Sequence, residues 1–138
     1  LAPGLWVGEG TELAPSCKVE TPVVLGKYVR VGKNAHLGAH SIIGDHSIVG
    51  EQASLKKSIL WNHTYIGYQT EIRGAILAHH THLKSGVAVY EGAVLGEGCT
   101  IGSKAVVKPA GRTWPDKYLV TAGGQTSLVD KALTKPPI

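Results

Sequence analysis

An aliphatic residue returns every six positions along most of this chain, and a glycine often follows it. Within residues 37–50 the pair recurs as Leu37-Gly38, Ile43-Gly44 and Val49-Gly50. A six-residue period fits neither the 3.6-residue turn of a helix nor the two-residue alternation of an ordinary strand. A fixed short repeat of this length is typical of parallel β-helices. The pattern therefore predicts an all-β architecture made of stacked coils.

The repeat extends from Val7 to Val107, with two steps of five residues among the steps of six. Every aliphatic slot holds Val, Leu or Ile, and the slots are Val7, Leu13, Val19, Leu25, Val31, Leu37, Ile43, Val49, Leu55, Leu60, Ile66, Ile72, Leu77, Leu83, Val89, Leu95, Ile101 and Val107. Grouped in threes, these slots predict six triangular coils around a narrow interior. The shortened steps, Leu55 to Leu60 and Ile72 to Leu77, then fall at the same corner, which keeps the slots aligned.

The two ends fall outside this repeat. We expect a lead-in at residues 1–6, the β-helix at 7–112, and a capping segment with a tail at 113–138. Trp6 is expected to plug the open end of the first coil. After Lys108 the chain is expected to leave the helix axis, with Trp114 capping the last coil. A short helix is expected from Thr126 or Ser127, either of which can cap its N-terminus, to about residue 133.

Composition narrows the possible partners and the compartment. The net charge of +4 is scattered, so there is no footprint for nucleic acid, and no segment resembles a signal peptide or a membrane span. Cys17 and Cys99 lie in the first and last coils, about 24 Å apart along the axis, too far to form a disulfide. Two free thiols favour a cytoplasmic location. Because the chain begins at Leu1 without Met, we expect it to be part of a longer protein.

Three histidines hold the same place in successive coils. His46, His63 and His80 each lie three residues after the first slot of their coil, and Tyr28 holds that place in the second coil. They should form a column on one outer corner, with about 4.8 Å between neighbours. Neighbouring histidines on such a ladder could bind Zn²⁺, but three in line do not surround one ion. Solvated, stacked rings are the favoured interpretation, and no metal or other cofactor is expected.

Several segments allow a family comparison: Pro22-Val23-Val24-Leu25-Gly26, Ser58-Ile59-Leu60-Trp61, and Val107-Lys108-Pro109 running into Thr113-Trp114-Pro115-Asp116-Lys117. The hexads resemble the left-handed parallel β-helix of hexapeptide-repeat proteins, which implies the handedness. The quoted segments are similar to the C-terminal domain of nucleoside-diphosphate-sugar pyrophosphorylases, particularly the mannose-1-phosphate guanylyltransferase type. The last segment, with 126–129 after it, resembles the bacterial form in which a phosphomannomutase-like domain follows.

The resemblance implies a domain that assembles subunits or regulates a catalytic domain. In that family the catalytic residues lie in an N-terminal Rossmann-like domain with a Gly-rich loop ending in Arg and with metal-binding Asp. This chain contains neither feature, so no catalytic residue can be assigned. The expected function is a non-catalytic assembly or regulatory domain of a sugar-nucleotide pyrophosphorylase.

Two enzymatic alternatives share the hexapeptide repeat. Many hexapeptide-repeat proteins are acyltransferases that use coenzyme A or acyl carrier protein and carry a catalytic His on or beside an extruded loop. From Val7 to Val107 no step exceeds six residues, so no such loop is expected. A γ-class carbonic anhydrase binds Zn²⁺ with three His across a trimer interface. This chain lacks that spacing, and its three histidines form a column within one subunit.

The outward residue before each slot identifies a contact surface. On the side that leads into slots 25, 43, 60, 77 and 95, these residues are Val24, Ile42, Ile59, Ile76 and Val94. The second side is mixed and the third is largely polar. Trp61 projects beside the aliphatic row. An exposed apolar stripe of this size is expected to bind a partner, either another copy of the domain or the catalytic domain of the same enzyme.

Overall fold

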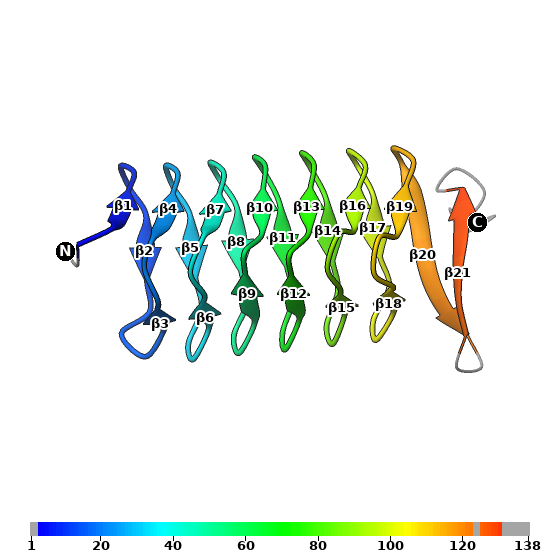
Figure 1. Ribbon diagram of the computed structural model, residues 1–138, viewed down its shortest axis with the longest axis horizontal. Helices are drawn as coiled ribbons and strands as arrows, with labels where there is room; N and C mark the ends of the chain where they lie inside the picture. Colours follow the sequence, from blue (N-terminus) through cyan, green and yellow to red (C-terminus); the bar gives the residue numbers. More distant parts are fainter. Residues whose placement is uncertain (1–2, 123–124, 131–138) are drawn as a thin grey trace.

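The chain folds into a prism of stacked coils with three flat sides (Figure 1). The computed structural model describes residues 3–122 and 125–130, and every regular element within them is a β-strand. From β1 to β20, consecutive strands lie on different sides, and each pairs in parallel with the strand one coil away. Six complete coils are followed by two strands of a seventh. The predicted all-β fold of stacked parallel coils is confirmed.

The three sides are three sheets, which we call sheets A, B and C, and their strands are parallel except for the last strand of sheet B. Sheet A contains β1 (Leu5–Val7), β4 (Val23–Leu25), β7 (Ser41–Ile43), β10 (Ile59–Leu60), β13 (Ile76–Leu77), β16 (Val94–Leu95) and β19 (Arg112–Thr113). Sheet B contains β2 (Glu12–Leu13), β5 (Arg30–Val31), β8 (Ile48–Val49), β11 (Tyr65–Ile66), β14 (His82–Leu83), β17 (Thr100–Ile101), β20 (Lys117–Ala122) and β21 (Gln125–Asp130). Sheet C contains β3 (Lys18–Val19), β6 (His36–Leu37), β9 (Ser54–Lys56), β12 (Glu71–Arg73), β15 (Ala88–Val89) and β18 (Val106–Val107).

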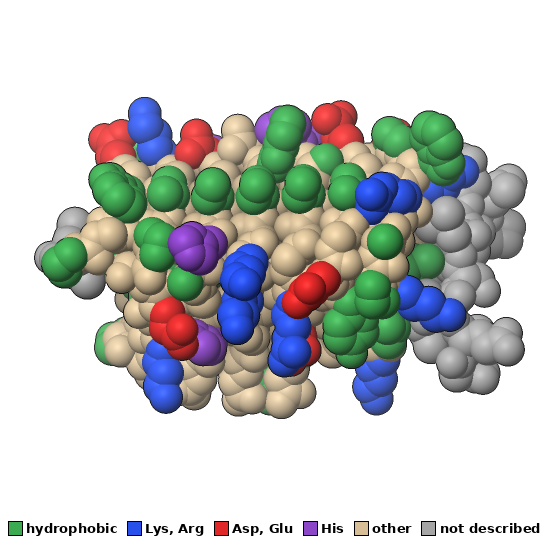
Figure 2. All heavy atoms as spheres, in the orientation of Figure 1, with side chains coloured by type: hydrophobic (Ala, Val, Ile, Leu, Met, Phe, Trp, Pro, Cys, Tyr) green, Lys and Arg blue, Asp and Glu red, His purple; other side chains and the backbone are tan. Residues whose placement is uncertain are grey.

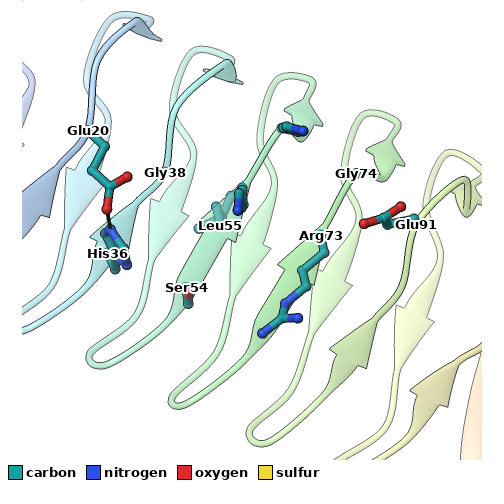
Figure 3. A pocket seen from close by; sticks show the side chains of 10 residues that line it. Glu20, His36, Gly38, Ser54, Leu55, Arg73, Gly74 and Glu91 are labelled. Carbon is teal, nitrogen blue, oxygen red and sulfur yellow. Dashed lines mark hydrogen bonds and ion pairs between the residues drawn. The ribbon is translucent and has the colours of Figure 1, made fainter.

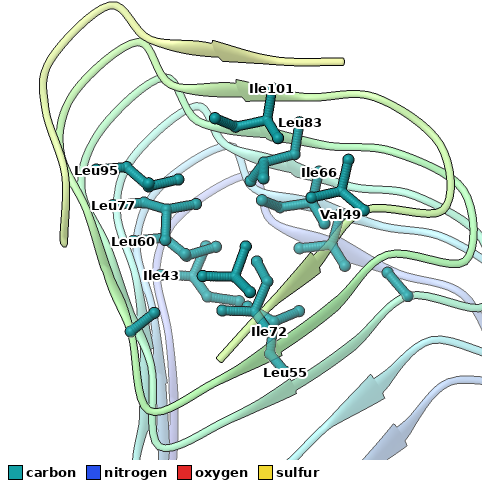
Figure 4. Close-up of a cluster of buried hydrophobic side chains, with 14 of the residues drawn as sticks. Ile43, Val49, Leu55, Leu60, Ile66, Ile72, Leu77, Leu83, Leu95 and Ile101 are labelled. Atoms are coloured by element: carbon teal, nitrogen blue, oxygen red, sulfur yellow. The ribbon is translucent and has the colours of Figure 1, made fainter. Parts of the chain in front are cut away.

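The aliphatic slots stack on one another in register. In sheet A, Ile43 pairs with Leu60, and Leu60 pairs with Leu77. Both five-residue steps lie at the corner between sheets C and A, so the ladders stay aligned after each one. Figure 4 shows the slot side chains converging on the interior from all three sides. In coils two to six each slot is at most 5% exposed, which stabilises the fold by about 1.5–3 kcal/mol per side chain before chain entropy is counted.

Small hydroxyl side chains fill the rest of the interior and hydrogen-bond to the corners. The Ser41 hydroxyl donates to the Gly38 carbonyl at 2.8 Å, and the Thr64 hydroxyl donates to the Trp61 carbonyl at 2.8 Å. Ser47 accepts from the Thr64 amide and donates to the Trp61 carbonyl. No buried side-chain nitrogen or oxygen in the described part of the chain lacks a partner. Polar residues are therefore compatible with the interior because each one is satisfied.

The repeat does not end where the sequence predicted. Arg112 pairs with Val94, and Thr113 with Leu95, so β19 continues sheet A beyond the expected boundary at residue 112. Leu119 then stacks next to Ile101 in sheet B. The prediction that the chain leaves the axis after Lys108 is wrong. Thr113 fills an inward slot although it is not aliphatic, because its hydroxyl accepts a hydrogen bond from the Gly96 amide at 2.9 Å.

Neither tryptophan covers an end of the prism as expected. Trp6 lies in β1 with its side chain 60% exposed, and Trp114 is 72% exposed. Trp6 pairs with Val24, so it occupies the outward position of sheet A and faces away from the interior.

The predicted helix near the C-terminus is also wrong within the described residues. Residues 125–130 form β21, which pairs antiparallel with β20. The rest of that prediction, residues 131–133, lies outside the described residues.

Candidate functional site

The outward face of sheet A carries a continuous row of hydrophobic side chains, which we call the apolar stripe. Its members are Trp6, Val24, Ile42, Ile59, Ile76 and Val94. Figure 2 shows a row of hydrophobic side chains crossing the coils along this sheet, with a basic side chain at its C-terminal end. The register places Arg112 next to Val94 at that end. Ile42 is 43% exposed, although it packs against neighbours on both sides.

Trp61 enlarges the stripe on the side nearer sheet B. It directly follows β10, is 49% exposed, and occupies a corner where the neighbouring coils have Gly44 and Ala78. The His79 ring meets the indole edge-on, with the ring centroids 4.9 Å apart. This contact fixes the indole in a projecting position beside Ile59.

The other two sheets present different outward surfaces. Sheet B carries Glu12, Arg30, Ile48, Tyr65, His82 and Thr100, and sheet C carries Lys18, His36, Ser54, Glu71, Ala88 and Val106. The aliphatic character of sheet A is therefore specific to one side, and β-propensity acting equally on all sides does not account for it.

The predicted histidine column is present on the corner between sheets A and B. Tyr28, His46, His63 and His80 stack face to face, with centroid distances of 5.2, 5.0 and 4.9 Å between successive rings. The planes of His46 and His63 differ by 2°, and those of His63 and His80 by 5°. Nearly parallel rings do not direct their nitrogens at a common point. Among the described residues, no group of three His, Cys, Asp or Glu side chains is arranged to hold a metal ion.

A ladder of side chains next to this column hydrogen-bonds one coil to the next. The Lys27 amide donates to Asp45 Oδ1 at 2.9 Å, and the Asp45 amide donates to Asn62 Oδ1 at 2.9 Å. The Asn62 amide donates to His79 Nδ1 at 3.2 Å. Asp45 and His79, which lie close to the column, are therefore engaged in holding the corner.

A hollow of about 320 Å³ lies along the corner between sheets C and A (Figure 3). His36 Nε2 and Glu20 Oε1 lie 2.6 Å apart at one end of it, and Glu91 lines the other. Between them are Lys56 and Lys57, with the backbone of Gly38 and Gly74. The hollow spans both five-residue steps, with Lys56 and Lys57 at the first and Arg73 and Gly74 at the second. The short steps are visible in the sequence, whereas the hollow was not predicted.

The two cysteines lie in the first and sixth coils as predicted and are both free. Cys99 is fully buried, and its Sγ lies 3.0 Å from the Trp114 carbonyl oxygen. Cys17 is partly buried, and this burial raises the pKa of its thiol, opposed by a smaller effect of its backbone hydrogen bond. A raised thiol pKa reduces the thiolate fraction at neutral pH, which disfavours a nucleophilic role for Cys17.

A family model decides the classification. The model described as the EIF2B subunit epsilon LbH domain, a left-handed β-helix, matches residues 3–107, which is most of the chain. The chain belongs to this family. The predicted left-handed β-helix of hexapeptide-repeat type is thereby confirmed. A comparison with curated proteins found no match.

Solved structures with the same fold are described as acyl- or acetyltransferases. A variant of AntD, an N-acyltransferase from Bacillus cereus in complex with dTDP and coenzyme A, is 16% identical with a TM-score of 0.79, over 91% of this chain and 83% of that one. The acetyltransferase domain of PglB from Neisseria gonorrhoeae is 22% identical with a TM-score of 0.60, over 85% of this LbH chain and 56% of that one. At these identities the likeness shows a shared fold. In the described part of the chain, no helix is long and apolar enough to cross a membrane.

Proposed function

We propose that this LbH chain is a non-catalytic assembly or regulatory domain of a sugar-nucleotide pyrophosphorylase, a nucleotidyltransferase of the mannose-1-phosphate guanylyltransferase type. The observation that carries the proposal is the apolar stripe with Trp61 on sheet A. Monomeric proteins rarely leave a contiguous apolar patch of several hundred Å² exposed. The family match supports an assembly role, since the matching family model describes a domain from one subunit of EIF2B. The pyrophosphorylase-like segments support the choice of parent enzyme.

The shape of the coils supports a non-catalytic role for the chain itself. From β1 to β20, no connection between consecutive strands is longer than four residues. A catalytic loop therefore has no place to extend from these coils. The chain also lacks the Gly-rich loop and metal-binding Asp that the resemblance assigns to the catalytic domain. We expect the purified chain to transfer nothing and to require no cofactor.

The oligomeric state of the purified chain tests this proposal. Replacing Ile59→Lys and Ile76→Lys together places two charges on the stripe without touching the interior. We expect sedimentation equilibrium to show an oligomer for the wild type and a 14.5 kDa monomer for the double variant. The matched control is Ile48→Lys with Tyr65→Lys on sheet B, which should keep the wild-type mass. A double variant with the wild-type mass would contradict the proposal, as would sugar-nucleotide synthesis by the chain alone.

Acyl transfer is a second candidate function. The fold shared with AntD favours it, because AntD is an N-acyltransferase whose structure contains coenzyme A. The short connections between coils argue against it. Incubation with acetyl-coenzyme A and an amine acceptor, followed by measurement of released thiol, distinguishes the two functions. We expect thiol release at the same rate with and without the protein. Thiol release that saturates with acetyl-coenzyme A concentration would favour the acyltransferase function.

A further inference from the structure

The outward residues of sheet A follow nearly the same order in both directions from the middle strand. From β1 to β19 they are Trp6, Val24, Ile42, Ile59, Ile76, Val94 and Arg112. Ile59 lies at the centre, with an isoleucine on each side of it and a valine beyond each isoleucine. The row ends in the aromatic ring of Trp6 on one side and the guanidinium group of Arg112 on the other. A cation of this type is attracted to the face of an aromatic ring. The outward residues of sheets B and C show no such symmetry.

We propose that sheet A binds a second copy of this chain with the coils running antiparallel, about a two-fold axis that is parallel to the strands and passes between Ile59 and its counterpart. The inference rests on the proposed assembly function and specifies its partner and register. The axis places Val24 against the partner's Val94, Ile42 against the partner's Ile76, and Ile59 against its own counterpart. In a two-fold interface the same surface serves on both subunits, so a sequence that is symmetric about its centre matches itself.

The ends of the stripe provide the polar part of this match. Trp6 is the most exposed member of the stripe, and Arg112 lies six strands away at the other end. Arg112 Nη1 donates to the Gly92 carbonyl at 2.6 Å and to the Ala110 carbonyl at 3.2 Å, which holds the guanidinium in place. The same axis carries the partner's Trp6 to this guanidinium. One dimer therefore contains two ring–cation contacts, one at each end.

Trp61 extends this match beside the stripe. An axis that brings two sheets face to face and reverses the direction of the coils runs parallel to the strands, so it leaves each edge of the sheet on its own side. Trp61 lies two residues after Ile59, on the side nearer sheet B. The partner's Trp61 therefore lies over Trp61 itself, and the two projecting indoles meet near the centre of the dimer.

The length of sheet A sets the size of the contact. Seven strands spaced by about 4.8 Å give a contact length of about 29 Å. Each strand presents one outward side chain, and Trp61 beside β10 adds a further one. A standard interface takes about 20–30 residues from each partner, so corner residues beside the stripe must complete this one.

Photochemical cross-linking tests the antiparallel direction. The 138-residue chain is made with p-benzoylphenylalanine in place of Trp6, which keeps an aromatic ring at that position. This variant is mixed with ¹⁵N-labelled wild type, so that mass spectrometry separates links between chains from links within one chain. We expect the inter-chain link to join position 6 to the peptide that contains Arg112. Links between position 6 and the partner's residues 5–25 would overturn the antiparallel arrangement.

Charge complementation at position 59 tests the position of the axis. Ile59→Lys and Ile59→Glu are each expected to be monomeric by sedimentation, because each places like charges face to face. Their equimolar mixture is expected to recover the dimer, since position 59 meets position 59. Loss of the dimer in both variants without recovery on mixing would overturn this register but leave assembly through sheet A. If neither variant changes the wild-type mass, both the register and the proposed assembly function fail.

Discussion

Residues in the left-handed region of backbone conformation define the corners of the prism. The third residue after a slot adopts positive φ in most coils, including His46, His63 and His80 at 59–60°. This conformation costs a non-glycine residue roughly 1–2 kcal/mol relative to the right-handed one. At the corner between sheets A and B, each coil repeats the turn of the coil before it. The rings of the histidine column are therefore aligned. The stacked column follows from the backbone and needs no metal to hold it.

Position 63 tests the cost of this conformation. His63→Val places a β-branched side chain at φ 60°, where His63→Asn places a residue that tolerates that region. Both variants remove the ring stacking with His46 and His80, so their difference isolates the backbone term. We expect the valine variant to have a free energy of unfolding about 1–2 kcal/mol lower than the asparagine variant in urea titrations. Equal stabilities would show that the corner relaxes.

At the scale of elements, the glycine that follows many of the aliphatic slots permits close approach between coils. A glycine at this position could provide either a positive φ or room for backbone contact. Gly44, Gly50 and Gly67 do not have positive φ. A Cβ on Gly67 would lie 2.7 Å from the carbonyl carbon of Lys84 and 2.8 Å from the carbonyl oxygen of Leu83. Room for the neighbouring coil is therefore the reason for glycine at these positions.

Gly67→Ala tests that reason. The added methyl group meets backbone atoms of the next coil, which cannot move as a flexible side chain would. Overpacking of this kind costs about 1–3 kcal/mol, and we expect a loss of that size in the free energy of unfolding by urea titration. Ser85→Ala, at an exposed position of the next coil, is the control and should change stability by less than about 0.5 kcal/mol. A Gly67→Ala variant as stable as this control would contradict the close-approach account.

The six-residue period predicted the coils because an aliphatic residue at a slot is enough to identify that slot as buried in the interior. Ile66 and Leu83 are fully buried, and the hexad alone identifies both as interior residues. The C-terminal strands were not predicted because their pairing depends on contacts that the hexad pattern does not encode. Thr113 breaks the aliphatic rule yet fits the interior through hydrogen bonding, and β21 forms against β20 although its sequence also suits a helix. Gly123-Gly124 between two short runs was the available signal for a hairpin.

The candidate site was partly predictable for a similar reason. The apolar stripe and the histidine column follow from the repeat, because residues one period apart must stack. The place of Trp6 in the stripe was missed, since Trp6 precedes the first slot and was expected to plug the prism. The hollow beside Lys56 and Lys57 depends on how two short corners stack, which the order of residues does not show.

At the scale of the whole molecule, a stack of coils is stabilised by contacts between neighbours, so its end coils are less stable than its middle. The slots of the first coil, Val7, Leu13 and Val19, are only half-buried, whereas those of the fourth coil are at most 1% exposed. The C-terminal end differs, because β19 and β20 stack on the sixth coil and Leu119 is buried there. Local opening should therefore begin at the N-terminal coil.

Hydrogen exchange measured by mass spectrometry tests this asymmetry. We expect amides in residues 8–19 to exchange at least about tenfold faster than those in 61–72, because local opening of an end coil breaks contacts on one side alone. Amides in 96–107 should exchange at rates close to the middle coils, since two further strands cover them. The measurement should be repeated on Ile59→Lys, which removes any contribution from a bound second copy. Equal exchange at both ends of that variant would contradict the asymmetry and show that the first coil is as firmly held as the sixth.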